Sequence, residues 1–285
     1  MLKRKSKSVL ITGVSSGIGY GLARAFVKKG YIVFGSVRRQ NDAERLAGEL
    51  GPGFKALVFD VTDAKGVEAS VKKVREELKG EGLGGLINNA GMAAGGPLMH
   101  QSLDEIRGTF EVNVIGLLSV TKACLPLLGA EENHNSLPGR IINISSVGGK
   151  IAGPFIGAYN GSKFAVEGIS HSLRRELLLY GIDVVIIGPG AVNTPIWDKS
   201  GDGKAYEGTR YYDSLIGFAK YFIEQGRKGF SVERISNEIL KIFEKRKPKA
   251  RYALVPNKFT AWTIPRLLPD RMLDRIIGKR LGFIK

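Results

Sequence analysis

Cysteine and histidine are scarce in this chain of 285 residues. Cys124 is the only cysteine, so no disulfide can form within the chain, and nothing in the sequence points to an oxidising compartment. His100, His134 and His171 lack the short spacings of metal ligands. We therefore expect no metal site, and a buried, inert thiol at Cys124.

Long hydrophobic runs are also missing. No stretch of about 18 apolar residues occurs, which argues against a membrane-spanning helix. The basic N-terminus runs into the apolar residues 9–11, which are too few for the core of a signal peptide. Because 43% of the residues are hydrophobic, we expect one large domain with a full core, located in the cytoplasm.

The net charge of +16 is concentrated at the two ends of the chain. Residues 1–8 carry four basic and no acidic groups, and residues 241–285 carry thirteen basic and three acidic groups. The basic clusters at residues 3–5 and 245–247 lack the interleaved aromatic residues of a platform that stacks bases. We therefore expect no nucleic-acid partner.

Short apolar runs alternate with amphipathic stretches along most of the chain. The runs predict strands at residues 8–12, 31–37, 54–59, 85–88, 140–144, 182–187 and 252–255. Helix-like segments lie near residues 18–29, 42–50, 64–79, 103–129, 158–180 and 233–246. This alternation predicts a doubly wound α/β fold of the Rossmann type, with about seven parallel strands and helices on both faces of the sheet.

Four loops rich in Gly, Ser and Asn follow directly on predicted strands, at residues 12–19, 88–96, 143–149 and 188–194. Ligands of such sheets bind beyond the carboxyl ends of the strands, so these loops indicate one shared site. Residues 195–232 then break the alternation and show weak periodicity. A long insertion at this place predicts a mobile lid over the substrate.

The first loop leads from a predicted strand into a predicted helix. Its glycines permit a tight turn and let the backbone approach a pyrophosphate, which the N-terminus of the helix attracts. The strand before the loop and the helix after it supply the context that such a motif requires. We expect cofactor contacts here from Gly13, Ser15, Ser16, Gly17, Ile18 and Gly19.

The end of the second predicted strand indicates which dinucleotide is bound. Folds that bind NAD usually place an acidic residue there to hold the ribose 2′-hydroxyl. Here Val37 is followed by Arg38 and Arg39, whose guanidinium groups suit the 2′-phosphate of NADP. Ser16, where a second basic residue would strengthen this interpretation, leaves NAD open as the alternative. Asp60 ends the third strand and suits either the adenine amino group or a simple strand-end cap.

Tyr159 and Lys163 lie four residues apart, and Ser146 lies thirteen residues before the tyrosine. Residues at i and i+4 share a helix face, so the lysine ammonium can stand beside the phenol and favour its phenolate form. Such a trio can move a proton to or from a carbonyl oxygen. Tyr-x-x-x-Lys is common by chance, so its weight depends on the other motifs.

Five motifs together resemble those of the short-chain dehydrogenase/reductase family, over about residues 8–195. They are Thr-Gly-x-x-x-Gly-x-Gly at 12–19, Asn-Asn-Ala-Gly at 88–91, Asn-x-Ser-Ser at 143–146, Tyr-x-x-x-Lys at 159–163 and Pro-Gly at 189–190. The resemblance implies that Ser146, Tyr159 and Lys163 form the catalytic group. It also implies that Asn113 holds a water in a proton relay, although a polar helix residue satisfied by a neighbour would look the same.

The implied reaction interconverts a ketone or aldehyde and an alcohol. Tyr159 donates a proton to the carbonyl oxygen or accepts one from the alcohol, and Ser146 hydrogen-bonds that oxygen. Lys163 favours the tyrosinate and contacts the nicotinamide ribose, so Tyr159 and Lys163 also count among the expected cofactor contacts. The remaining expected cofactor contacts are Asp60, Val61, Asn89, Ala90, Gly91, Pro189, Gly190, Val192 and Thr194.

Residues 1–256 form the expected Rossmann-type domain, and residues 257–285 form a basic extension. The apolar residues of a predicted helix in this extension share one face: Met272, Leu273, Ile276, Ile277 and Leu281. A cationic amphipathic helix near Trp262 suits peripheral contact with an anionic membrane. Packing of that face on the core or on a second subunit is the alternative.

The extension also resembles the hydroxysteroid and retinol dehydrogenase branch of the family, which handles bulky apolar alcohols and ketones. Phe155 and Ile156 add apolar surface just before Tyr159. The predicted lid adds Ile196, Trp197, Leu215, Ile216, Phe218 and Phe222. A steroid-, retinoid- or lipid-like carbonyl compound is therefore the expected substrate.

The leading hypothesis is an NADP(H)-dependent oxidoreductase, and an NAD-dependent alcohol dehydrogenase of the same fold is the alternative. A non-catalytic nucleotide-binding regulatory or scaffold protein is the alternative from another class, but such a protein has no need of the trio. The resemblance also implies a dimer or tetramer that pairs through residues 103–129 and 158–180.

Overall fold

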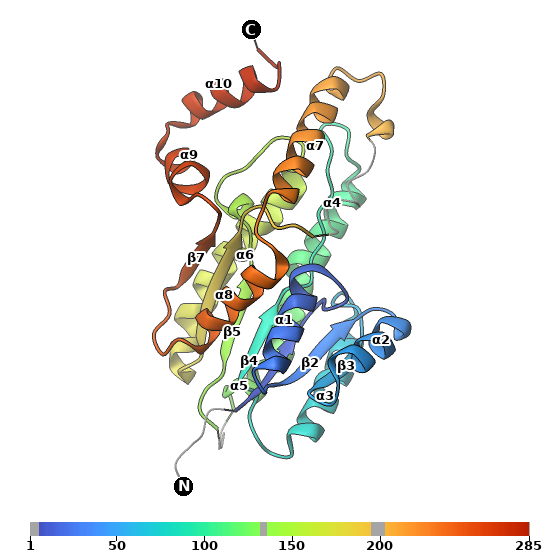
Figure 1. Ribbon diagram of the computed structural model, residues 1–285, viewed down its shortest axis with the longest axis vertical. Coiled ribbons are helices and arrows are strands. Elements are labelled where there is room, and N and C mark those ends of the chain that lie inside the picture. The colour runs from blue at the N-terminus through green and yellow to red at the C-terminus, as the bar shows by residue number, and fades with distance from the viewer. Residues whose placement is uncertain (1–5, 132–135, 195–202, 285) are drawn as a thin grey trace.

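The computed structural model of the protein describes residues 6–131, 136–194 and 203–284 (Figure 1). At its centre lies one parallel sheet of seven strands in the order β3-β2-β1-β4-β5-β6-β7. The strands are β1 (Ser8–Ile11), β2 (Ile32–Val37), β3 (Phe54–Val58), β4 (Gly85–Asn88), β5 (Arg140–Ile144), β6 (Asp183–Pro189) and β7 (Arg251–Leu254). The predicted fold and the number of strands are confirmed.

Helices cover both faces of this sheet (Figure 1). They are α1 (Gly17–Lys28), α2 (Gln40–Leu50), α3 (Ala64–Leu78), α4 (Leu103–Phe110), α5 (Leu117–Leu128), α6 (Gly157–Glu176), α7 (Tyr212–Arg227), α8 (Val232–Glu244), α9 (Ile264–Leu267) and α10 (Asp270–Arg280). One apolar cluster joins the sheet to α1, α2 and α8, and a second joins its other face to α3 and α5. The strands β1, β4 and β5 are buried along their whole length, as expected for a parallel sheet between two helical layers.

Cys124 lies in the second cluster and is fully buried. Burial disfavours the thiolate and raises the pKa of the Cys124 thiol to about 12. The expected inert thiol agrees with this environment.

The predicted helix at residues 103–129 is interrupted by a π-helical turn, η1 (Glu111–Gly116), between α4 and α5. The whole run Leu103–Leu128 is long and apolar enough to cross a membrane by length and composition. This differs from the expectation drawn from the absence of a long apolar run. A helix packed in the core of a soluble protein meets the same criteria, and half of the most apolar window is buried here.

The described part of the predicted lid is regular structure, with the short turn η5 (Lys204–Tyr206) followed by α7. The periodicity was too weak to predict this helix because only Leu215 and Gly226 in it are buried. Ile196 and Trp197 lie outside the described residues. Movement of this insertion as a lid stays a prediction.

The C-terminal extension comprises the π-helical turn η6 (Phe259–Thr263), α9 and α10. It returns to the upper part of the molecule in Figure 1, where α7 also lies. The Ser214 hydroxyl of α7 donates to the Leu281 carbonyl at 2.7 Å, and the Arg280 guanidinium stacks over the Tyr221 ring at 4.0 Å. The predicted amphipathic helix is therefore present as α10, and its end is attached to the predicted lid.

Candidate active site

The strand order reverses between β1 and β4, which brings the loops that follow these two strands together. The Thr12 hydroxyl accepts hydrogen bonds from the backbone amides of Asn89 and Ala90, both at 2.9 Å. The Asn89 side chain in turn donates to the Thr12 carbonyl at 2.8 Å. The two loops that the sequence singled out separately thus form one rigid unit.

Gly13 and Gly19 shape the first loop. Gly13 has a φ of +70°, a conformation that favours glycine. A Cβ atom on Gly19 would lie 2.2 Å from the Gly13 carbonyl oxygen and 2.5 Å from the Asn89 side-chain nitrogen. No side chain larger than hydrogen fits at Gly19 without moving the loop.

The loop opens onto the N-terminus of α1. Ser16 is the residue before the helix, and its side chain caps none of the first backbone amides. These amides and the positive end of the helix dipole are suited to an anionic group. Together with the close-packed glycines, they form a cradle that fits the pyrophosphate of a dinucleotide.

The end of β2 is joined to the same loop. The Gly13 amide donates to the Ser36 hydroxyl at 3.1 Å, and the Val14 amide donates to the Ser36 carbonyl at 3.0 Å. Arg38 and Arg39 follow directly and are exposed to solvent. Their position at this edge is the one that the sequence predicted for cationic groups near a 2′-phosphate.

Arg45 is a residue that sequence reasoning missed. From α2 it donates to the Ser15 carbonyl at 3.0 Å, and it pairs with Asp42 and Glu49. Hydrogen bonds to these two carboxylates raise the pKa of Arg45. Its i–3 and i+4 acidic neighbours resemble any solvated helix face, so the sequence held no specific signal for it.

Asp60 and Val61 follow β3, and their contacts are structural. The Asp60 carboxylate accepts from the Thr62 amide at 3.0 Å and from the Thr62 hydroxyl at 2.8 Å. Val61 is buried, and a Cβ on Gly116 would lie 2.6 Å from its side chain. These hydrogen bonds of Asp60 are those of a strand-end cap, one of the two roles that the sequence left open. Contact of Asp60 with an adenine stays a prediction.

Ser146, Tyr159 and Lys163 converge at the ends of β5 and α6. Ser146 precedes a short turn, η2 (Val147–Gly149), and its hydroxyl accepts from the Gly148 amide at 3.0 Å. Tyr159 lies in the first turn of α6 and is hydrogen-bonded to the Ser146 side chain. Lys163, one turn further along α6, is buried and donates to the Ile144 carbonyl at 2.9 Å. The structure therefore brings the predicted trio together.

Burial dominates the protonation of this trio. It raises the pKa of Tyr159, and the hydrogen bond with Ser146 lowers it only in part. Burial also lowers the pKa of Lys163 to about 8. The lysine nitrogen lies 5.8 Å from the centre of the tyrosine ring, and it donates its hydrogen bond to the Ile144 carbonyl. Lys163 is not among the causes of the shift at Tyr159, and the expected stabilisation of the phenolate by the lysine stays a prediction.

Asn113 lies in η1 and is buried. Its side-chain oxygen accepts from the Met92 amide at 2.8 Å, and its side-chain nitrogen donates to the Met92 carbonyl and to the Ser162 hydroxyl, both at 2.9 Å. The side chain thus ties the loop after β4 to α6, beside Lys163. Its role in a water relay stays a prediction. Insertion of a π-turn at this point is a common device of functional sites.

The segment after β6 completes the edge. Pro189 ends the strand, and the Gly190 amide donates to the Leu254 carbonyl at 2.9 Å. Val192 is buried and bridges to Phe230. A Cβ on Gly17 would lie 3.5 Å from the Thr194 side chain, so Thr194 faces the first loop.

An aromatic cluster lies above the residues that precede Tyr159. Phe155 is buried, and the rings of Tyr211, Phe218 and Phe283 lie 6.2, 5.6 and 5.6 Å from its ring. Phe155 has a φ of +63°, which a side chain rarely adopts and which is held by surrounding contacts. The predicted lid and the C-terminal extension therefore both contribute aromatic rings to a cluster around Phe155, four residues before Tyr159.

Glu167 and Arg251 support the loop at Ser146, and sequence reasoning did not find them. Glu167 is 1% exposed, and Arg251 donates to its two carboxylate oxygens at 3.0 and 2.9 Å. Arg251 also donates to the Ser146 carbonyl at 3.3 Å, and its guanidinium stacks on Trp262 at 4.1 Å. The two residues are far apart in sequence, so no local pattern relates them.

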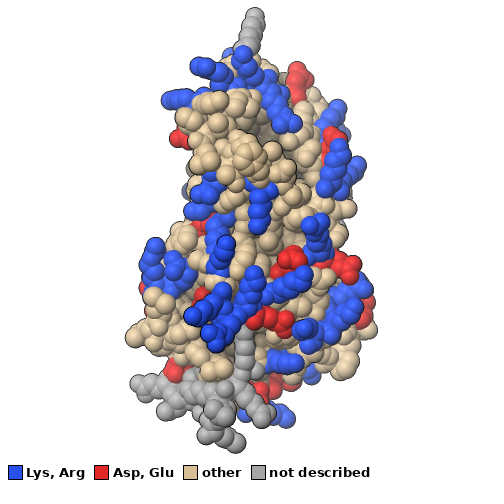
Figure 2. All heavy atoms as spheres, turned by 60° about the vertical axis from the view of Figure 1, so that its left-hand side comes forward, with Lys and Arg blue, Asp and Glu red and all other residues tan. Residues whose placement is uncertain are grey.

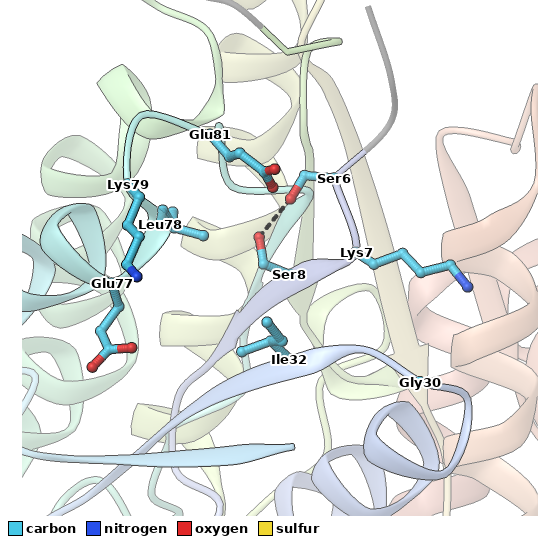
Figure 3. A pocket seen from close by; sticks show the side chains of 9 residues that line it. All are labelled: Ser6, Lys7, Ser8, Gly30, Ile32, Glu77, Leu78, Lys79 and Glu81. Carbon is cyan, nitrogen blue, oxygen red and sulfur yellow. Dashed lines mark hydrogen bonds between the residues drawn. The ribbon is translucent and has the colours of Figure 1, made fainter. Parts of the chain in front are cut away.

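A shallow cavity of about 390 Å³ lies at the other end of the sheet (Figure 3). It surrounds Ser6 and Ser8, whose hydroxyls are hydrogen-bonded at 2.8 Å, at the amino end of β1. None of the expected catalytic or cofactor-binding residues lines it. Among the described residues, no group of three or more His, Cys, Asp or Glu side chains is arranged to hold a metal ion.

Comparison with known proteins finds relatives that match most of the chain. The profile of the family described as short chain dehydrogenase matches residues 7–205. The chain is 40% identical to the NADPH-dependent 3-dehydrocapnine reductase of Ornithobacterium rhinotracheale, over 95% of this chain and 96% of that protein. It is 32% identical to the 3-ketodihydrosphingosine reductase of Bacteroides thetaiotaomicron, over 93% and 94% of the two chains. A crystal structure of a short-chain dehydrogenase from Streptomyces avermitilis superposes with a TM-score of 0.77 at 28% identity, over 98% and 96% of the two chains.

Gly19→Ala tests the cradle. The added methyl group meets the Gly13 carbonyl, so we expect a loss of NADPH binding of about a hundredfold or more, measured by fluorescence titration, with the fold retained by circular dichroism. Gly48→Ala is the matched control, because a Cβ there has nothing within 4 Å. Equal affinities in the two variants would contradict the assignment of this loop.

Lys163→Met tests the buried ammonium. Folded Lys163 releases its proton near pH 8, whereas an unfolded lysine keeps it to about 10.5, so between these pH values the unfolded state binds more protons. Raising the pH therefore stabilises the wild-type fold. The free energy of unfolding of the wild type, relative to the variant, should rise by up to about 3 kcal/mol over this window. Urea unfolding of both proteins at several pH values measures this difference in unfolding free energy. A difference that does not change with pH would contradict the lowered pKa of Lys163.

Proposed function

Because the chain belongs to the short-chain dehydrogenase family, we propose that it is an NADP(H)-dependent reductase that converts the ketone or aldehyde of a hydrophobic molecule into an alcohol. The observation that carries the proposal is the convergence of Ser146, Tyr159 and Lys163 beside the dinucleotide cradle. The same residues serve the reverse oxidation, since acid and base exchange roles when the direction changes.

Tyr159 is the proton donor of the proposed reaction. Its pKa is raised by burial, so the phenol is protonated at neutral pH and ready to protonate the carbonyl oxygen as charge develops there. Ser146 lies within hydrogen-bond reach of Tyr159 and donates its own hydroxyl to the same oxygen. When bound, NADPH supplies the hydride.

The proposed cofactor contacts follow the edge of the sheet. The first loop and the N-terminus of α1 hold the pyrophosphate, and Arg38 and Arg39 hold the 2′-phosphate. The turn at residues 88–91 and the segment at 189–194 flank the two riboses and the nicotinamide. The NADPH dependence named for the relative from Ornithobacterium rhinotracheale supports NADP over NAD.

We propose a lipid-like substrate with a keto group near one end. The names of two relatives, 3-dehydrocapnine reductase and 3-ketodihydrosphingosine reductase, both describe reduction at carbon 3. The aromatic cluster around Phe155 offers apolar surface next to Tyr159 for such a chain.

The proposal includes a homo-oligomer and peripheral contact with a membrane. Ile115 of η1 and Phe164 of α6 are 49% and 44% exposed, and they lie on the helices through which pairing is expected. The basic C-terminal extension supports contact with a membrane, where a lipid-like substrate would reside.

Tyr159→Phe keeps the ring and removes the acid. We expect kcat for any carbonyl substrate to fall by about a hundredfold or more, while NADPH affinity stays nearly unchanged. Tyr180→Phe, an exposed tyrosine after α6, is the control and should retain activity. Turnover by Tyr159→Phe at the wild-type rate would eliminate the proposed proton transfer. Tight NADPH binding without turnover of any carbonyl compound by the wild type would favour the scaffold alternative.

Arg38→Ala tests the choice of cofactor. Loss of the guanidinium should weaken NADPH binding by about tenfold or more and leave NADH binding nearly unchanged, because only NADPH carries the 2′-phosphate. Fluorescence titration with both nucleotides measures this, with Lys73→Ala on α3 as a control that removes the same charge from an exposed position. Equal losses for the two nucleotides would count against a phosphate contact.

A further inference from the structure

Large apolar side chains are exposed along the C-terminal extension, in η6, in α9 and α10, and in the residues that follow. They are Phe259, Leu267, Met272, Ile276, Phe283 and Ile284, each with 42% or more of its surface accessible. Leu267 at 76% and Phe259 at 66% are more exposed than most apolar residues of a folded domain. Exposed apolar side chains concentrated in one segment mark an interaction surface.

Cationic side chains lie among these apolar groups. The extension carries Lys258, Arg266, Arg271, Arg275, Lys279 and Arg280 against Asp270 and Asp274. Figure 2, turned so that the side of α9 and α10 comes forward, shows Lys and Arg gathered around uncharged surface in the upper part of the molecule. A surface of this composition complements an anionic, partly apolar partner.

The two sides of α10 differ. Leu273, Ile277 and Leu281 are half-buried, whereas Met272 and Ile276 point to solvent. The spacing of four residues places Met272 and Ile276 on one face, where Arg275 and Lys279 are their i+3 neighbours. One side of α10 therefore packs on the protein, which is one of the alternatives that the sequence left open. The other side is left for a partner.

A few side-chain contacts join this surface to the residues around Ser146 and Phe155. Trp262 is stacked between the guanidinium groups of Arg251 and Arg266, at 4.1 and 4.5 Å, and Arg251 reaches the Ser146 carbonyl. The ring of Phe283 packs on Phe155, just before Tyr159. Because α10 also contacts α7 through Arg280, binding at its outer face places the partner at the end of the molecule where Phe283 packs on Phe155.

We propose that the outer face of η6, α9 and α10 binds the surface of a bilayer that contains anionic phospholipids. The cationic groups contact the headgroups, and Phe259, Leu267, Met272 and Ile276 insert among the upper acyl segments. The bilayer then delivers its lipid-like ketone at the end of the molecule where Phe283 and Phe155 meet. Delivery of substrate rests on the proposed reduction, whereas binding to the bilayer specifies the proposed membrane contact and does not depend on that reaction.

Flotation of the full chain with vesicles tests the surface. We expect binding to vesicles of phosphatidylcholine mixed with phosphatidylglycerol, little binding to pure phosphatidylcholine, and weaker binding at high salt. The double change Arg275→Glu and Lys279→Glu should reduce binding about tenfold or more. Lys72→Glu with Lys73→Glu, on exposed positions of α3, makes the same charge change and should leave binding within about twofold.

Met272→Ser with Ile276→Ser tests the apolar contribution at constant net charge, and it should also weaken binding to the mixed vesicles. Both α10 variants should reduce a short water-soluble ketone at the wild-type rate, because neither touches the site. Failure of the wild type to float, or equal losses in the α3 and α10 variants, would overturn the proposal. So would conversion of a dimer to a monomer by the Ser variant without vesicle binding, since that face would then join two copies of the chain.

If the protein binds vesicles but reduces no ketone, the bilayer-binding surface is supported and the proposed reduction is rejected. If the protein reduces a soluble ketone but does not bind vesicles, the proposed reduction is supported and the bilayer-binding surface is rejected. The two proposals are therefore tested separately.

Discussion

The reversal of strand order between β1 and β4 is the constraint on which the rest of the site depends. In a parallel sheet every strand ends at the same edge, and at the reversal the connections leave on opposite faces and open a crevice. The hydrogen bonds of Thr12 with Asn89 and Ala90 hold the two sides of this crevice together. The cradle at the N-terminus of α1 and the trio at the start of α6 are then brought to one place by backbone geometry.

Burial shifts the pKa values of two side chains in this site. Both Tyr159 and Lys163 lose contact with water, and each is shifted toward its neutral form. The positions of the two side chains are held by protein hydrogen bonds, to Ser146 for the tyrosine and to Ile144 for the lysine. Little reorganisation is needed when charge develops.

The C-terminal extension is connected to the same site by an arginine side chain. Arg251 contacts the buried Glu167 carboxylate, the Ser146 carbonyl and the ring of Trp262, so it links the loop at Ser146 to the extension through one side chain. A guanidinium can do this because its planar fork donates in several directions while its face stacks on an aromatic ring. The extension therefore adds the Phe283 ring to the aromatic cluster around Phe155, and its outer apolar side chains stay exposed to solvent.

Local patterns determined much of this protein. Strand and helix periods predicted the seven strands, and five short motifs predicted the loops, because glycine turns and an i, i+4 pair depend on neighbours in the chain. The tertiary structure alone decided the burial of Tyr159 and Lys163, which depends on distant residues and shifts the pKa of each toward its neutral form. It also decided the contacts of Arg45, the pairing of Glu167 with Arg251, the hydrogen bonds of Asn113 and the helix α7. Each of these rests on contacts between remote segments or on partial burial, neither of which leaves a periodic trace in the sequence.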